Sequence, residues 1–262
     1  MRKIFESHAH YEDARFDEDR DELLTRLFEN EIAYIVNVGS SMETSRRSLE
    51  LAGRYDRIYA AIGVHPEETA ELDEENIEKL KEMASHAKEN KVVAIGEIGL
   101  DYYWPEPSRE IQKQWFERQL QLAREVKLPV IIHSREAAKD TLDRIKAFHG
   151  EEIGGVIHCF SYSREMAREY LDMGFYIGIG GVVTFPNGRK LVEAAEYVPL
   201  DRILLETDCP YLSPVPKRGK RNSSENLIYV ADKIAQIKGI STEEVIEATY
   251  KNAGKMYRIM EG

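Results

Sequence analysis

Short apolar stretches alternate with longer amphipathic ones along almost the whole chain of 262 residues. This alternation limits the possible folds more than any other feature, because strands that are joined through helices pair in parallel. Eight apolar stretches are predicted to be β-strands: Lys3–Phe5, Tyr34–Val38, Ile58–Gly63, Val92–Ile95, Val130–Ile132, Gly155–Ile157, Phe175–Ile179 and Ile203–Leu205. The clearest predicted helices between and after them are Asp19–Asn30, Glu74–Glu89, Ser108–Val126, Ser163–Met173 and Ser241–Tyr257. The sequence therefore predicts an α/β fold with a parallel sheet.

Eight strand–helix units in a chain of this length fit a closed (β/α)8 TIM barrel, in a single domain that spans residues 1–262. The alternative is a doubly wound open sheet. A dinucleotide-binding sheet of that kind has Gly-x-Gly-x-x-Gly after its first strand, and this chain has no such motif there. Its glycine-rich stretch, Gly178–Gly181, comes only at the seventh predicted strand, where we expect it to allow close backbone packing.

The composition excludes several classes of protein. A net charge of −11 argues against non-specific coating of nucleic acid, although bound metal ions can reverse the charge of a single pocket. No run of eighteen apolar residues exists, so no membrane span is expected, and residues 1–6 lack the apolar core of a signal peptide. Two cysteines, Cys159 and Cys209, give no disulfide framework, and we expect a cytoplasmic protein without an obligate protein partner.

Histidines gather where the predicted strands end. Five of the seven histidines lie there, whereas His86 and His149 fall in polar stretches and are expected at the surface: the five are His8, His10, His65, His133 and His158. Because barrel active sites form at the carboxyl ends of the strands, these side chains are predicted to meet at one end of the barrel. Taken alone, the His8-Ala9-His10 pair is equally compatible with two partly buried histidines that have ordinary hydrogen-bond partners.

Two acidic residues follow other predicted strands, Glu97 after the fourth and Asp208 after the eighth. Together with four imidazoles they exceed the ligand set of one tetrahedral zinc ion. They suit two divalent ions about 3.5–4 Å apart that share a bridging carboxylate. Such a pair of ions lowers the pKa of a shared water and holds an oxyanion, which is the chemistry of phosphate ester or amide hydrolysis.

Seven motifs resemble those of the TatD family of metal-dependent deoxyribonucleases, within the wider group of amidohydrolase-like barrels. They are Ser7–His10, Ile62–Pro66, Ala94–Tyr102, Pro129–Ala137, Gly155–Ser161, Glu206–Leu212 and Arg218–Asn222. The resemblance covers essentially the whole length of the chain. It implies a nuclease that uses two divalent ions, zinc, magnesium or manganese, and that trims single-stranded DNA ends.

The resemblance also implies residue roles. The expected ligands are His8, His10, Glu97 and Asp208 for one ion, and the bridging Glu97 with His133 and His158 for the other. Asp208 would also orient or deprotonate the metal-bound water, so Asp208 and Glu97 are the expected catalytic residues. His65 would contact the substrate phosphate; the alternative is a ring that only packs under Pro66.

The predicted loop Pro210–Ser224 has the densest basic cluster of the chain, and we expect Arg218 and Arg221 in it to contact substrate. Arg135 lies two residues after His133 and would add a donor on the same face. The aromatic residues 102–104 either stack on bases or pack against the lip of the barrel. Two other functions stay open: hydrolysis of another bond (a misacylated tRNA ester, an amide or a lactone) by the same barrel, and a non-catalytic binding protein.

The chain departs from the family pattern at three places. Glu6 stands where the family usually has Asp, Tyr11-Glu12 where it has Leu-Asp, and Ser223-Ser224 where it has Glu-Pro. Glu6 and Glu206 each lie two residues before a predicted ligand and are expected to orient it, or, for Glu206, to pair with a basic residue of the barrel wall. Each cysteine follows a predicted ligand, so both are expected to face the helix layer as buried small side chains.

Overall fold

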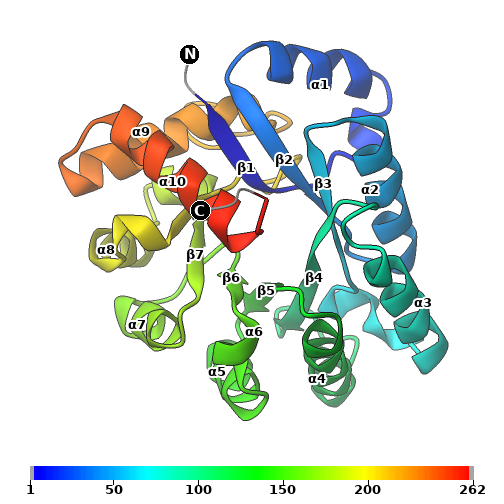
Figure 1. Cartoon of the computed structure of the whole chain (residues 1–262). Helices are drawn as coiled ribbons and strands as arrows, with labels where there is room; N and C mark the ends of the chain where they lie inside the picture. Colours follow the sequence, from blue (N-terminus) through cyan, green and yellow to red (C-terminus); the bar gives the residue numbers. More distant parts are fainter. Residues whose placement is uncertain (1–2, 260–262) are drawn as a thin grey trace.

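Eight parallel strands, paired in sequence order, form the single sheet of the computed structural model, which describes residues 3–259. The strands are Ile4–Ala9 (β1), Ile32–Val38 (β2), Ile58–Ile62 (β3), Val92–Asp101 (β4), Val130–Arg135 (β5), Gly155–Ile157 (β6), Tyr176–Ile179 (β7) and Ile203–Leu205 (β8). They surround a central axis, with the helices outside (Figure 1). The last strand meets the first just beyond β8, where a parallel bridge joins Ala9 to Cys209. The predicted (β/α)8 barrel is confirmed.

Ten α-helices are present in residues 3–259, and they include all five that the sequence predicts. They are Arg20–Glu29 (α1), Met42–Arg54 (α2), Glu74–Ser85 (α3), Arg109–Val126 (α4), Ala138–Ala147 (α5), Gly150–Ile153 (α6), Arg164–Asp172 (α7), Arg189–Tyr197 (α8), Leu227–Lys238 (α9) and Thr242–Met256 (α10). Short 3-10 helices cover Ala14–Phe16 (η1), Pro66–Glu71 (η2), Gly181–Thr184 (η3), Leu200–Arg202 (η4) and Ser224–Asn226 (η5). Within the described part of the chain, none of the helices is long and apolar enough to cross a membrane.

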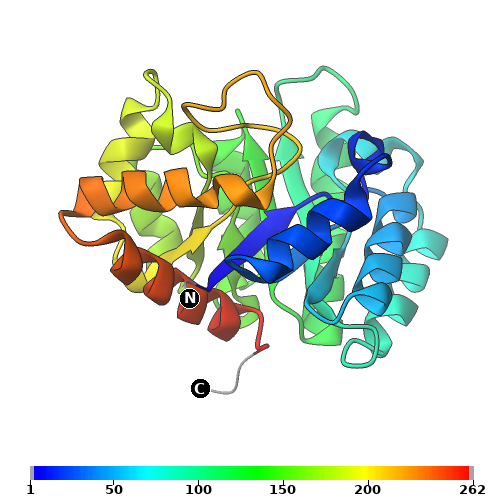
Figure 2. The same ribbon diagram turned by 90° about the horizontal axis from the view of Figure 1, so that it is seen from above.

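One end of the barrel is sealed by α10, which crosses it in Figure 1. The side chain of Tyr257, which follows α10, stacks on Phe5 of β1 with ring centroids 6.1 Å apart, and its hydroxyl donates to the Ser7 carbonyl oxygen at 2.8 Å. Ala253 and Met256 join the same apolar cluster, which fills the barrel interior. Figure 2 shows the loop after β8, in orange, at the opposite end from α10. The strands finish at that opposite end, where a cleft lined by residues of several strands is present.

Three strands continue past their predicted carboxyl ends. β1 continues to Ala9, β4 to Asp101 and β5 to Arg135, so that His8, Glu97 and His133 lie inside strands rather than after them. Gly99 allows β4 to pass β5, because a Cβ atom at Gly99 would lie only 1.9 Å from the carbonyl oxygen of His133. The close backbone packing expected in Gly178–Gly181 is found at Gly181, where a Cβ atom would lie 2.2 Å from the carbonyl oxygen of Leu212.

Candidate metal centre

A cleft of about 720 Å³ lies at the carboxyl ends of the strands. Five of the six predicted metal ligands line it: His10, Glu97, His133, His158 and Asp208. The sixth, His8, is 1% exposed and lies in contact distance of Glu97 and Asp208. The structure thus brings together side chains from five strand ends that are up to 200 residues apart in the sequence.

The first donor cluster consists of His8, His10, Glu97 and Asp208. His8 Nε2 lies 3.2 Å from His10 Nε2, 3.5 Å from Glu97 Oε2 and 3.7 Å from Asp208 Oδ1. His10 Nε2 lies 3.3 Å from the same Asp208 oxygen and 3.9 Å from Glu97 Oε2. A tetrahedral ion with bonds of about 2.0–2.2 Å has donors about 3.3–3.6 Å apart. The spacing and chemistry of these four donors therefore fit one divalent metal ion.

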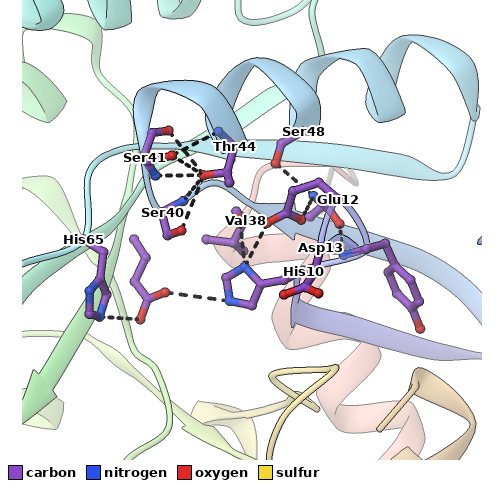
Figure 3. A network of polar contacts seen from close by, with 12 residues as sticks. His10, Glu12, Asp13, Val38, Ser40, Ser41, Thr44, Ser48 and His65 are labelled. Carbon is purple, nitrogen blue, oxygen red and sulfur yellow. Dashed lines mark hydrogen bonds and ion pairs between the residues drawn. The ribbon is translucent and has the colours of Figure 1, made fainter. Parts of the chain in front are cut away.

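The tautomer of His10 is set by the backbone of β2. His10 Nδ1 donates to the Val38 carbonyl oxygen at 2.7 Å (Figure 3). Glu12 lies on the same side, with Oε1 3.4 Å from Nδ1, and is itself held by the side-chain amide of Asn37 at 2.7 Å. Because Nδ1 holds the proton, a neutral His10 ring presents the lone pair of Nε2 to the cluster, as a metal ligand must.

The second donor cluster consists of Glu97, His133 and His158. Glu97 Oε1 lies 2.8 Å from His133 Nδ1 and 2.7 Å from His158 Nε2, and these two nitrogens are 3.3 Å apart. The two oxygens of Glu97 thus face different clusters, which is the arrangement of a bridging carboxylate. Burial alone would raise the pKa of Glu97, but the charge of His158 and hydrogen bonds with the surrounding imidazoles hold that pKa well below its usual range. Glu97 is therefore ionised, as metal ligation requires.

Asp101 is a functional residue to which sequence reasoning assigned no role. Its Oδ2 lies 3.0 Å from His133 Nε2, so it fixes the His133 tautomer that leaves Nδ1 free for the second cluster. It also accepts the backbone N–H of Tyr103 at 2.9 Å, and is 1% exposed. The available signal was its spacing, because Asp101 lies four residues after Glu97 and shares a face with it on an extended strand.

Replacing Asp101 with asparagine is expected to weaken metal binding by about 10–100-fold, because the amide no longer orients His133 as a charged acceptor does. The dissociation constant for Zn²⁺, measured by competition with a chromogenic chelator, checks this. Glu68, a carboxylate that lines the same cleft outside both clusters, is the matched control as Glu68→Gln. Equal affinity in the two variants would contradict the role of Asp101.

His65 lies beside the second cluster, with Nε2 3.9 Å from Glu97 Oε1 and its ring centroid 4.3 Å from that of His133. Its Nδ1 accepts the backbone N–H of Glu67 at 3.3 Å and caps η2. Burial, together with the charge of His133, lowers the pKa of His65 to about 3, so the ring is neutral. Nε2 therefore has the proton and faces the cleft as a donor. The ring does more than pack under Pro66, while its contact with phosphate stays a prediction.

The three departures from the family pattern meet in one buried network below the first cluster. Glu6 Oε1 accepts the backbone N–H groups of His8 at 3.2 Å and Thr207 at 2.9 Å. Glu6 Oε2 accepts the hydroxyls of Thr207 at 2.6 Å and Ser224 at 2.9 Å. The Tyr11 hydroxyl lies 2.8 Å from Ser224 Oγ and accepts the Ser224 N–H at 2.9 Å. Proline at position 224 would have no N–H to donate, so Glu6, Tyr11 and Ser224 are suited to one another.

Removing the hydroxyl in Ser224→Ala is expected to lower the free energy of unfolding by about 1–3 kcal/mol, because Glu6 Oε2 loses one of its two hydroxyl donors and the buried Tyr11 hydroxyl loses its contact with Ser224 Oγ. Urea denaturation followed by circular dichroism measures this. The neighbouring Ser223→Ala is the control, since Ser223 Oγ makes only a 3.5 Å contact with Glu225. If the two variants were equally stable, the Ser224 hydroxyl would contribute nothing to the free energy of unfolding.

Glu206 lies below His158, whereas its spacing in the sequence related it to Asp208. Its Oε1 accepts the backbone N–H of Cys159 at 2.5 Å and lies 3.7 Å from His158 Nδ1. No lysine or arginine in residues 3–259 forms an ion pair with Glu206, so the alternative of a barrel-wall salt bridge is not found. Glu206 is placed to orient His158 from below.

The prediction for the cysteines is half wrong. Cys209 is fully buried in the apolar core outside the barrel, as expected. Cys159 instead lines the cleft and is only partly buried. The strict alternation of side chains fails there because β6 ends at Ile157, and Cys159 has a φ of 45°.

The predicted substrate residues are divided between two places. Arg135 lines the cleft, with its guanidinium 3.7 Å from the centroid of the Tyr103 ring. Tyr103 and Trp104 are 50% and 49% exposed, but neither lines the cleft, and Arg135 covers one face of the Tyr103 ring. Arg218 and Arg221 line a separate groove on the loop after β8. Seven carboxylates and two guanidiniums line the cleft itself. Its negative charge favours the binding of cations such as metal ions.

The barrel, its two donor clusters and its relatives define the class of this protein, a metal-dependent hydrolase. The family model described as "TatD related DNase" matches residues 5–258. The chain belongs to the TatD family.

Relatives of similar length support this assignment. The chain is 44% identical over 256 residues to the uncharacterized metal-dependent hydrolase YabD of Bacillus subtilis, covering 98% of this chain and 99% of that one. It is 37% identical over 259 residues to YcfH of Escherichia coli, also described as an uncharacterized metal-dependent hydrolase, covering 98% and 96%. The crystal structure of YjjV, a TatD homolog from Escherichia coli, superposes with a TM-score of 0.91 at 30% identity and 98% coverage of both chains.

Proposed function

We propose that this protein is a two-metal phosphodiester hydrolase that acts on DNA, and that it removes nucleotides from single-stranded ends. The observation that supports this most is the Glu97 carboxylate, whose two oxygens each lie within 3.9 Å of a different set of imidazole nitrogens. The family model described as a DNase supports nucleic acid as the substrate class. Zinc, magnesium and manganese are all compatible with the mixed imidazole and carboxylate donors.

Two divalent ions, when bound, would lower the pKa of a water molecule and offset the charge of a phosphodiester. Asp208 is suited to take the proton of that water, because its side chain is the most exposed carboxylate among the ligands, at 18%. Burial would raise the pKa of Asp208, but the hydrogen bond with His10 and the neighbouring histidine charges lower it, so the ionised base is present at neutral pH. His65 Nε2–H and the Arg135 guanidinium, which both line the cleft, would donate to phosphate oxygens.

End-labelled single-stranded DNA, incubated with the protein and Mg²⁺, Mn²⁺ or Zn²⁺, tests this proposal. We expect progressive shortening by the parent protein and none by Asp208→Ala. Absence of cleavage with all three ions would overturn the DNA assignment, and equal cleavage by the variant would assign the activity to a contaminant. A chromogenic ester, an amide and a lactone in parallel test the alternative of another hydrolysed bond.

A further inference from the structure

A second groove, of about 420 Å³, lies next to the metal cleft on the loop that follows β8. Leu212 lines both the groove and the cleft. The groove has no acidic lining residue, whereas the cleft has seven. Its charged lining residues are Arg15, Arg218, Lys220 and Arg221. Two adjacent surfaces of an acidic protein therefore have opposite charge.

The four cations of the groove differ in how far they are neutralised. Arg15 forms a two-pronged ion pair with Asp13 at 3.0 and 2.9 Å, and Arg221 donates to Asp19 at 2.8 Å. Arg218 donates only to the Ser213 carbonyl oxygen at 3.3 Å and lies 4.0 Å from the centroid of the Phe185 ring. In residues 3–259, no carboxylate forms an ion pair with Arg218 or with Lys220. These two charges remain available to an anion.

An aromatic side chain connects the groove to the metal cleft. Tyr211 lines the cleft, and its ring centroid lies 6.4 Å from that of His10. The guanidinium of Arg15 lies 4.1 Å from the centroid of the same ring, on the groove side. Tyr211 is 46% exposed, so one face of the ring is available for stacking. A single nucleic-acid strand, with flat bases and anionic phosphates, can extend from His10 over Tyr211 to the groove.

We propose that this groove is a phosphate-binding subsite, which holds the backbone of a single-stranded substrate away from the phosphodiester that is cleaved. This inference rests on the proposed function, because it places the rest of the strand relative to the metal cleft. Lys220 and Arg218 bind phosphate oxygens, and Tyr211 stacks on a base between the two sites. Substrates of several nucleotides reach the groove, whereas a small phosphodiester occupies only the cleft.

Neutralising Lys220 tests the subsite, and the same loop provides a matched control. Lys220→Gln removes a charge from the groove, whereas Lys217→Gln removes an identical charge from a side chain that lies 5.9 Å from the Tyr229 ring centroid and does not line the groove. The probe is a fluorescein-labelled ten-nucleotide single strand, with binding measured by anisotropy at several salt concentrations. Hydrolysis of bis(4-nitrophenyl) phosphate reports on the cleft alone.

We expect Lys220→Gln to weaken binding of the strand by about 3–10-fold. In the double variant Arg218→Gln/Lys220→Gln, the slope of the logarithm of the binding constant against the logarithm of salt concentration should become shallower by about 0.7 per lost phosphate contact. Lys217→Gln should stay within about twofold of the parent, both in strand binding and in hydrolysis of the small phosphodiester. Equal strand binding by Lys220→Gln and Lys217→Gln would overturn the subsite even if DNA is cleaved. A parent that binds the strand through Lys220 but cleaves no DNA would instead overturn the proposed function and leave the subsite supported.

Discussion

Replacing Glu97 with glutamine is expected to lower hydrolysis at least about a thousandfold, the largest loss of activity of any single substitution considered for this chain. The physical reason is that both donor clusters share this one carboxylate. Its Oε2 lies near His8, and its Oε1 lies near His133 and His158. A neutral amide removes a negative charge from both clusters, and metal-ion catalysis contributes several kcal/mol, of which each 1.36 kcal/mol is tenfold in rate.

The measurement for Glu97→Gln combines metal content, by mass spectrometry after dialysis, with kcat/KM for a chromogenic phosphodiester. We expect fewer than two ions per chain and almost no turnover, with an unchanged circular dichroism spectrum. Glu68→Gln removes a carboxylate from the same cleft and should keep both metal content and activity within about twofold. A Glu97→Gln protein that retains two ions and a tenth of the activity would contradict the bridging role.

Replacing Gly99 with alanine is expected to lower the free energy of unfolding by about 4 kcal/mol. The added Cβ atom would lie 1.9 Å from the His133 carbonyl oxygen, and Gly99 has a φ of 150°, which residues with a side chain rarely adopt. Backbone strain and forced displacement of β5 each cost about 1–3 kcal/mol. Because His133 must move, the variant should also lose affinity at the second donor cluster.

Gly53→Ala is the control for this substitution. Gly53 lies in α2, and a Cβ atom there would meet nothing within 4 Å. Alanine should therefore stabilise the helix by up to about 1 kcal/mol, the opposite sign from Gly99→Ala. Urea denaturation of both variants, monitored by circular dichroism and fluorescence, measures the difference. A Gly99→Ala protein as stable as the parent would show that β4 and β5 do not approach as closely as the structure has them.

The predicted strand ends show which strand boundaries the local sequence pattern can determine. The predicted β6 and β8 match the structure, because each is a short apolar run that ends at a polar or charged residue. The predicted β4 ended at Ile95, whereas the strand continues to Asp101. Gly96, Glu97 and Gly99 interrupt the apolar run, so the local sequence has no signal for extension. Pairing with β5, through Gly99 opposite His133, provides the hydrogen bonds that keep this segment extended.

The grouping of the six candidate metal ligands was predictable, whereas the residues that orient them were predictable only in part. Histidines at strand ends are rare enough, and metal chemistry selective enough, that their grouping follows from the barrel topology. The position of Glu6, two residues before His8, indicated an orienting role, whereas Asp101 is one of 47 acidic residues and was given no role until its contact with His133 was seen. The basic loop likewise indicated charge but not that Arg221 would be neutralised by Asp19.

The sequence by itself determined the (β/α)8 barrel, the six candidate metal ligands and the family, because periodicity and side-chain chemistry are local properties of the chain. Only the tertiary structure decided that Glu6 meets Ser224, which lies 218 residues away, and that Arg218 and Lys220 line a groove beside the cleft. The physical reason is closure of the barrel: the end of β8 pairs with β1 through Ala9 and Cys209, and that pairing brings distant segments into contact.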